Sequence, residues 1–191
     1  LLAALRRFRG PVLFRGLRTS SRLGAPFWPS GLTLRSSGRL RRRLPWPLAL
    51  MSMISKYHGT SKQVAKDLQQ GNIDHTLGGG ELGQGFYLGD LLWVAKTWAH
   101  NRHGSDSSVL KVDVPDPSFN ALAIELLSRT EALTLRKEIK ANNATRTYTH
   151  GFDVLWSPIV GTTRVEADQY KYESKNGADL LNGTLCTRSL V

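Results

Sequence analysis

The amino-acid sequence predicts one domain of the α/β (α+β) class, in which short strands alternate with helices. Five segments have the alternating or aromatic-apolar character of strands, and segments with helical spacing lie between them. Because the strands are unequally spaced, their sheet need not be parallel. A chain of 191 residues suits a single domain with a sizeable core. We expect this domain at residues 51–185, followed by a short tail, 186–191.

The first predicted strand and helix have clear boundaries. The strand "MISKYHG" covers residues 53–59, and the helix "TSKQVAKDLQQG" covers residues 60–71. Thr60 stands at the first position of a capping box, and Gly71 provides a C-terminal stop.

The middle of the chain continues the alternation of strands and helices. The segment "GFYLG" (85–89) reads as a strand, after which Asp90 can cap a helix at 91–101. A strand follows at 108–114, and residues 117–142 read as two helices or as one interrupted helix.

The last third of the domain contributes two more strands and a short helix. The strands are expected at 152–160 and 167–174, and a last helical turn is expected at 175–183. The apolar stretches also predict that three tryptophans are buried in the core, namely Trp93, Trp98 and Trp156.

The positive charge of the chain is confined to its first fifty residues. The formal net charge is +11, from 26 basic and 15 acidic side chains. Residues 1–50 hold eleven arginines and no lysine, aspartate or glutamate, so residues 51–191 hold fifteen basic and fifteen acidic side chains. A neutral domain gives no support for a nucleic-acid partner.

The arginine-rich extension, residues 1–50, is expected to be disordered and has three explanations. Its composition fits a mitochondrial presequence, which is rich in arginine and serine and poor in acids. It also fits a basic arm that binds nucleic acid or a membrane. The third explanation is translated GC-rich DNA upstream of a start at Met51 or Met53, since the chain begins with leucine.

Several kinds of site are not expected. Cys186 is the only cysteine, which excludes an intramolecular disulfide and a multi-cysteine zinc site. No apolar run approaches the roughly 20 residues of a membrane span, so we expect no membrane partner. We expect a cytoplasmic protein, with mitochondrial location or delivery into a host as alternatives. Four histidines lack the spacing of metal ligands and are expected in loops or solvent: His75, His100, His103 and His150.

The segment "HTLGGGELGQGFYLGD" (75–90) contains six glycines and satisfies the G-x-G-x-x-G pattern of a dinucleotide-binding loop. That fingerprint requires a strand before the glycines and a helix after them, whereas here a helix and loop precede and a strand follows. A flexible linker is also disfavoured, because the glycines run straight into an apolar strand. We therefore expect a tight backbone approach at Gly83 and Gly85, with Phe86 and Tyr87 on opposite faces of the strand.

Three motifs in order resemble the ADP-ribosyltransferase superfamily, in the branch of diphtheria toxin and the poly(ADP-ribose) polymerases. They are "YHGT" (57–60), "LGQGFYL" (82–88) with the alanine-containing helix after it, and "ADQYKYES" (167–174). Small, little-characterised members of the superfamily are the most similar, because their third motif often reads Asp-Gln. The resemblance covers about residues 54–183 and implies a split antiparallel β-sandwich, with two apposed sheets, flanking helices and an NAD cleft between the sheets.

The resemblance also implies roles for individual residues. His58 would bond the ribose beside the nicotinamide, and the backbone of Gly59 would hold the carboxamide. Thr60 would bond the ribose, although capping of the following helix explains this residue equally well. Tyr87 would stack on the nicotinamide, and Gly85 would allow the close approach of the backbone. Without the resemblance, a histidine at a strand end and a tyrosine in a strand read as structural residues.

Gln169 occupies the third position, where many members have a glutamate that supports the positively charged transition state. An amide keeps the hydrogen bonding but has no charge. Glu173 lies on the same strand face but about 13 Å further along, so it is a poor replacement. Glu81 on the glycine segment is an unsupported alternative acid. Gln169 itself could instead be an exposed polar residue on an edge strand.

The resemblance implies mono-ADP-ribosyl transfer from NAD, as substrate, to a macromolecular acceptor, with release of nicotinamide and without a metal. Protein is the expected acceptor, since the neutral domain gives no support for nucleic acid. Two alternatives stay open. One is a non-catalytic module that binds NAD or ADP-ribose, which Gln169 favours. The other is an RNA 2′-phosphotransferase, which would be expected to carry a basic set of phosphate-binding residues that is not evident here.

Overall fold

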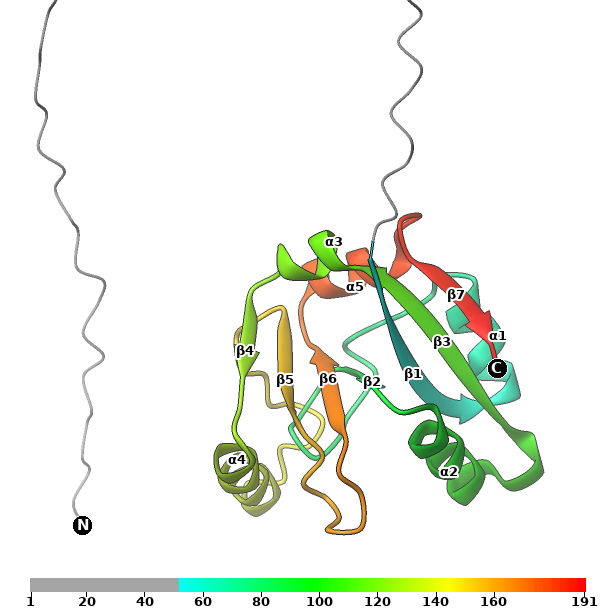
Figure 1. Cartoon of the computed structure of the whole chain (residues 1–191). Helices are drawn as coiled ribbons and strands as arrows, with labels where there is room; N and C mark the ends of the chain where they lie inside the picture. The colour runs from blue at the N-terminus through cyan, green and yellow to red at the C-terminus, as the bar shows by residue number, and fades with distance from the viewer. Residues whose placement is uncertain (1–51) are drawn as a thin grey trace, which may run out of the picture. The chain divides into compact units, whose positions relative to one another are not determined.

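The computed structural model describes residues 52–191, and the extension at 1–50 lies outside the described residues. One seven-stranded sheet runs through this part of the chain in the order β4-β5-β6-β2-β1-β3-β7 (Figure 1). All neighbouring strands are antiparallel except the parallel pair β4 and β5. The strands are β1 (Met53–Ser61), β2 (Phe86–Gly89), β3 (Ser107–Pro115), β4 (Ile124–Leu126), β5 (Val154–Pro158), β6 (Asp168–Tyr172) and β7 (Thr187–Leu190).

The expected mixed class and mainly antiparallel pairing are confirmed, but the expectation of two apposed sheets is not met. The strands belong to one sheet, which is weakest in its middle. β1 and β2 share a single register pair, Tyr57 opposite Gly89, whereas β1 and β3 share nine. The sheet therefore consists of two well-paired halves that meet along one seam between β1 and β2.

Among residues 52–191, five α-helices cover the two faces of the sheet: α1 (Lys62–Gln69), α2 (Leu92–His103), α3 (Asp116–Asn120), α4 (Arg129–Ala141) and α5 (Lys175–Asn182). On one face, α1, α3 and α5 pack against the largest apolar cluster through Leu68, Phe119 and Leu181. On the other face, α4 and α2 close two smaller clusters, one around each half of the sheet. Neighbouring residues of β3, Val109 and Leu110, belong to clusters on opposite faces, as strand alternation requires.

Two of the predicted helix caps are wrong. Ser61, not Thr60, caps α1, because its Oγ accepts from the backbone N of Val64. Thr60 is buried within β1. Asp90 does not cap α2; its carboxylate accepts from the backbone N of Asp168 and so joins the end of β2 to β6. The predicted stop at Gly71 is confirmed, since this glycine follows α1 with a φ of +91°.

Two short strands were not predicted. The segment 117–142 contains the strand β4 between α3 and α4, rather than helix alone. Residues 187–190, expected in a tail, form β7 and pair with β3 at the edge of the sheet. Three or four residues are too few to establish a period of two in a sequence, so these strands are defined by their pairing.

Two of the three tryptophans expected in the core lie on the surface. Trp93 and Trp98 on α2 are 54% and 53% exposed. The helix presents alanines to the sheet instead, and Ala95 and Ala99 are buried against β3. Among residues 52–191, none of the helices has the length and apolar character needed to cross a membrane.

Candidate functional site

His58 lies on β1 at the seam where β1 and β2 separate. Its Nδ1 bonds the backbone carbonyl of Tyr87 on β2 at 2.7 Å, and its ring stacks on Phe86 with 4.6 Å between centroids. A carbonyl only accepts, so Nδ1 carries the hydrogen and Nε2 is the acceptor of the neutral ring. Burial lowers the pKa of His58, which favours this neutral form. The imidazole therefore spans a gap that backbone hydrogen bonds leave open.

Position 59 requires a glycine because α2 crosses β1 at this point. A Cβ on Gly59 would clash with the backbone carbonyl of Ala95 on α2. The absence of a side chain thus lets α2 lie directly on β1. This close packing accounts for the glycine without a ligand, while its neighbour Thr60 is buried in the sheet.

The glycine segment is a tight loop that holds the ring of Tyr87. Gly80 and Gly83 pair with each other across the loop, and the Tyr87 hydroxyl donates to the carbonyl of Gly83 at 2.7 Å. A Cβ on Gly80 would lie 2.7 Å from a ring carbon of Tyr87, so only glycine fits there. Burial raises the pKa of the Tyr87 hydroxyl, which keeps it a neutral donor.

The expected close backbone approach at Gly83 and Gly85 is present. Gly83 has a φ of +101°, and a side chain there would meet the carbonyl of Tyr148. A Cβ on Gly85 would lie 2.7 Å from Cγ of Lys171 on β6. The two glycines therefore let the loop press against both β6 and the segment that precedes β5.

A buried ion pair, Lys171–Glu173, holds the glycine loop against the sheet. Lys171 Nζ lies 2.5 Å from Glu173 Oε2, and the two side chains are 0% and 1% exposed. Lys171 also donates to the carbonyl of Leu82 at 2.8 Å, while Glu173 Oε1 accepts from the backbone N of His150 and Gly151. Desolvation lowers the pKa of Lys171, and the carboxylate of Glu173 opposes this.

Gln169 is buried on an internal strand, so the alternative interpretation of this residue, an exposed polar residue on an edge strand, is wrong. Its amide nitrogen donates to Glu81 Oε1 and, at 3.3 Å, to the carbonyl of Pro158. Glu81 in turn pairs with Arg136 on α4, with 3.4 Å between Oε2 and Nε. The structure thus places a carboxylate of the glycine loop beside the uncharged third position.

The three expected catalytic side chains do not all converge. The pairing of Tyr87 with Lys171 and of Gly89 with Gln169 puts Tyr87 and Gln169 on the α2–α4 face of the sheet. His58 points to the opposite face, where it stacks on Phe86. The predicted separation of Phe86 and Tyr87 by strand alternation is confirmed, because Phe86 belongs to the largest apolar cluster and the Tyr87 ring lies against the glycine loop. It is the reason the His58 and Tyr87 rings lie apart. The bond from His58 to the Tyr87 carbonyl is what joins them.

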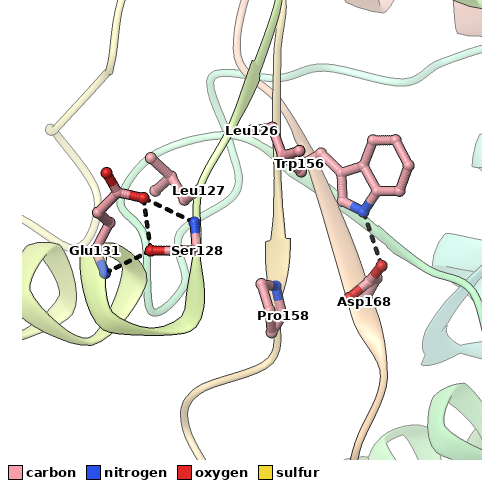
Figure 2. A pocket seen from close by; sticks show the side chains of 7 residues that line it. All are labelled: Leu126, Leu127, Ser128, Glu131, Trp156, Pro158 and Asp168. Atoms are coloured by element: carbon pink, nitrogen blue, oxygen red, sulfur yellow. Dashed lines mark hydrogen bonds between the residues drawn. The ribbon is translucent and has the colours of Figure 1, made fainter.

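An open pocket of about 370 Å³ lies elsewhere, at the end of β5 and the start of α4 (Figure 2). Within it, Trp156 Nε1 donates to Asp168 at 2.9 Å, and Ser128 and Glu131 form the capping box of α4. Of the third sequence motif, only Asp168 reaches this pocket. Its lining residues are Leu126, Leu127, Ser128, Glu131, Trp156, Pro158 and Asp168.

Sequence reasoning missed how Glu81 and Lys171 are used. Both carried a signal. Glu81 is the one acidic residue among the glycines of residues 76–89, and Lys171 stands between two tyrosines on an internal strand. Among residues 52–191, no three or more His, Cys, Asp or Glu side chains gather as a metal site would require. No protein-family model matches the chain, and no curated protein matches it.

Proposed function

We propose that the domain binds NAD at the seam between β1 and β2 and transfers a single ADP-ribose unit to a macromolecular acceptor. The observation that carries this proposal is the seam itself. Two adjacent strands separate after one register pair, and a neutral imidazole, that of His58, stands where they part. NAD bound at this seam would contact residues of both strands. His58 and Tyr87 can then contribute from opposite faces.

The chemistry is the cleavage of one glycosidic bond. The bond between ribose C1′ and the nicotinamide nitrogen breaks, and its electron pair leaves with nicotinamide. An acceptor nucleophile then bonds C1′ and releases its proton. Positive charge develops on the ribose in the transition state, so a fixed negative charge nearby accelerates the reaction. Glu81, through Gln169, is a source of such charge.

A second candidate is a module that binds NAD or ADP-ribose without catalysis. The favouring observation is that polar atoms of the three expected residues are already bonded within the protein. Nδ1 of His58 bonds the Tyr87 carbonyl, the Tyr87 hydroxyl bonds Gly83, and the Gln169 nitrogen bonds Glu81. In this alternative, these three residues hold the glycine loop and bind NAD or ADP-ribose, but they do not catalyse the cleavage of a bond.

Nicotinamide release from NAD by the full chain tests the proposal. We expect release with a suitable protein acceptor, loss of release in His58→Ala and Tyr87→Ala, and parent-like release in His103→Ala, an exposed histidine outside the seam. If calorimetry shows that NAD binds but no nicotinamide is released with any acceptor, the result supports the non-catalytic binding module. Absence of NAD binding in the parent overturns both candidates.

A further inference from the structure

Gln169 has a fixed orientation in which only its amide oxygen remains available. Its nitrogen donates to Glu81 Oε1 and to the carbonyl of Pro158. Both partners can only accept, so the nitrogen and not the oxygen must face them. None of the hydrogen bonds among residues 52–191 uses Gln169 Oε1. Gln169 as a whole is 7% exposed, and this burial limits the freedom of its side chain to turn.

The carboxylate of Glu81 is surrounded by two other segments, the β5–β6 connection and α4. The backbone N of Val160 donates to its Oε1 at 2.9 Å, and Arg136 pairs with its Oε2 at 3.4 Å. Gly161 leaves room for the carboxylate, because a Cβ there would clash with Glu81 Oε2. The glycine loop, the β5–β6 connection and α4 thus hold one carboxylate against one amide.

We propose that Glu81 is a positioning residue, which fixes Gln169 as a polarised hydrogen-bond acceptor for a ribose hydroxyl of NAD. A hydrogen bond to a carboxylate draws the amide hydrogens toward the charge and makes the amide oxygen more negative. The pair Glu81–Gln169 therefore supplies the acceptor that a single glutamate would supply, while Arg136 offsets part of the negative charge of Glu81. This inference rests on the proposed function, since it assigns the ligand of the seam.

The pair makes Gln169→Glu harmful rather than beneficial. The substitution sets a second carboxylate against Glu81, and like charges at this range raise the pKa of one of them. A carboxyl group whose pKa is raised in the folded protein does not weaken the fold at a pH below its unfolded pKa, because it is protonated in both states. As the pH rises from the unfolded pKa toward the folded pKa, the free energy of unfolding falls. We therefore expect the melting temperature of Gln169→Glu, relative to the parent, to fall between pH 5 and pH 8.

The reciprocal exchange is the deciding experiment. Four full-length proteins are compared, the parent, Glu81→Gln, Gln169→Glu and the double variant, by melting temperature against pH, NAD affinity by calorimetry, and nicotinamide release. Each single variant should lose about tenfold or more in NAD affinity or release. The double variant again has a single carboxylate, so it should lose the pH dependence. It should not recover NAD affinity, because the oxygen at position 81 that faces residue 169 also accepts from the backbone N of Val160 and cannot be replaced by a donor. Glu166→Gln, an exposed glutamate on the β5–β6 connection, is the matched control and should resemble the parent.

The outcomes separate this inference from the proposed function. Single variants that match the parent, or a double variant that recovers the NAD affinity of the parent, overturn the role of Glu81. A parent that binds NAD without releasing nicotinamide overturns the transferase, while loss of NAD affinity in Glu81→Gln still supports the pair. A parent that does not bind NAD overturns both.

Discussion

His58 illustrates how a single side chain replaces backbone pairing. The imidazole bonds a carbonyl of β2 where the two strands have parted, and burial keeps it neutral. The sequence predicted a special role for this residue, because a histidine before a glycine at a strand end is part of the resemblance. Its partner, a main-chain atom 29 positions away, leaves no trace in the pattern of side chains.

The neutral state of His58 predicts how stability depends on pH. Because burial lowers its pKa, the unfolded chain takes up the proton first on acidification, at about pH 6.5. The stabilisation from the neutral ring is complete above that value and is lost as pH falls toward the lowered pKa. We expect the melting temperature of His58→Asn, which cannot titrate, to fall less than that of the parent between pH 7.5 and pH 5. Equal slopes for the two proteins would contradict this assignment.

The contact between Glu81 and Gln169 shows what a single sequence cannot supply. The two residues are 88 positions apart, and they belong to a loop and to a strand. Gln169 could be singled out by its motif, and strand alternation correctly grouped it with residues 171 and 173. Alternation alone suggested a solvated polar face, whereas the glycine loop folds over that face and buries it. Tertiary packing, not local pattern, decides such a case.

At the level of elements, the packing of α2 on β1 depends on one glycine. We expect Gly59→Ala to destabilise the fold by about 1–3 kcal/mol, because the added Cβ forces the helix away from the strand. Gly89→Ala is the matched control, since a Cβ there has its nearest neighbour at 3.8 Å. Denaturant unfolding of both variants measures the difference. Similar midpoints for the two would show that α2 does not require the bare position.

The edge strand β7 joins the ends of two helices through Arg188. The guanidinium donates to the carbonyls of Leu181 and Gly183, at the end of α5, and of Gln69, at the end of α1. Charged donors near a helix C-terminus also interact favourably with its dipole. We expect Arg188→Met to cost about 1–3 kcal/mol in unfolding free energy. Arg129→Met, at the exposed start of α4, should cost much less in the same measurement.

The elements differ in how well the sequence predicted them. The long strands and helices have enough residues to show a period, and their positions were predicted to within a few residues. β4 and β7 have three and four residues and are recognised by their neighbours, Val154–Trp156 for β4 and the middle of β3 for β7. One register pair between β1 and β2 joins the strands into a single sheet, where two apposed sheets were expected. A sequence pattern does not show whether one such pair forms.

At the level of the whole molecule, the pair Lys171–Glu173 connects the sheet with both loops that lie on it. The pair is fully buried, and its members bond the glycine loop and the backbone before β5. Removing one member of a buried pair leaves an uncompensated charge, which costs about 3–5 kcal/mol. We expect that loss in Lys171→Met, and a smaller one in Lys171→Met/Glu173→Gln, where the remaining amide still accepts backbone hydrogens.

The exposed pair Lys175–Asp179 offers a matched control for this measurement. It has the same 2.5 Å separation, but its side chains are 82% and 59% exposed. Water screens such a pair, so Lys175→Met should change the unfolding free energy little. If the buried and exposed lysine variants unfold at the same denaturant concentration, Lys171 does not hold the loops in place.

The seam between β1 and β2 also sets where the sheet opens first. Nine register pairs hold β1 to β3, but one holds it to β2, so a fluctuation that parts the two halves breaks few backbone bonds. Deuterium should consequently enter the amides that border the seam well before those between β1 and β3. We therefore expect the two halves of the sheet to move relative to each other as rigid units, with the motion concentrated at the seam.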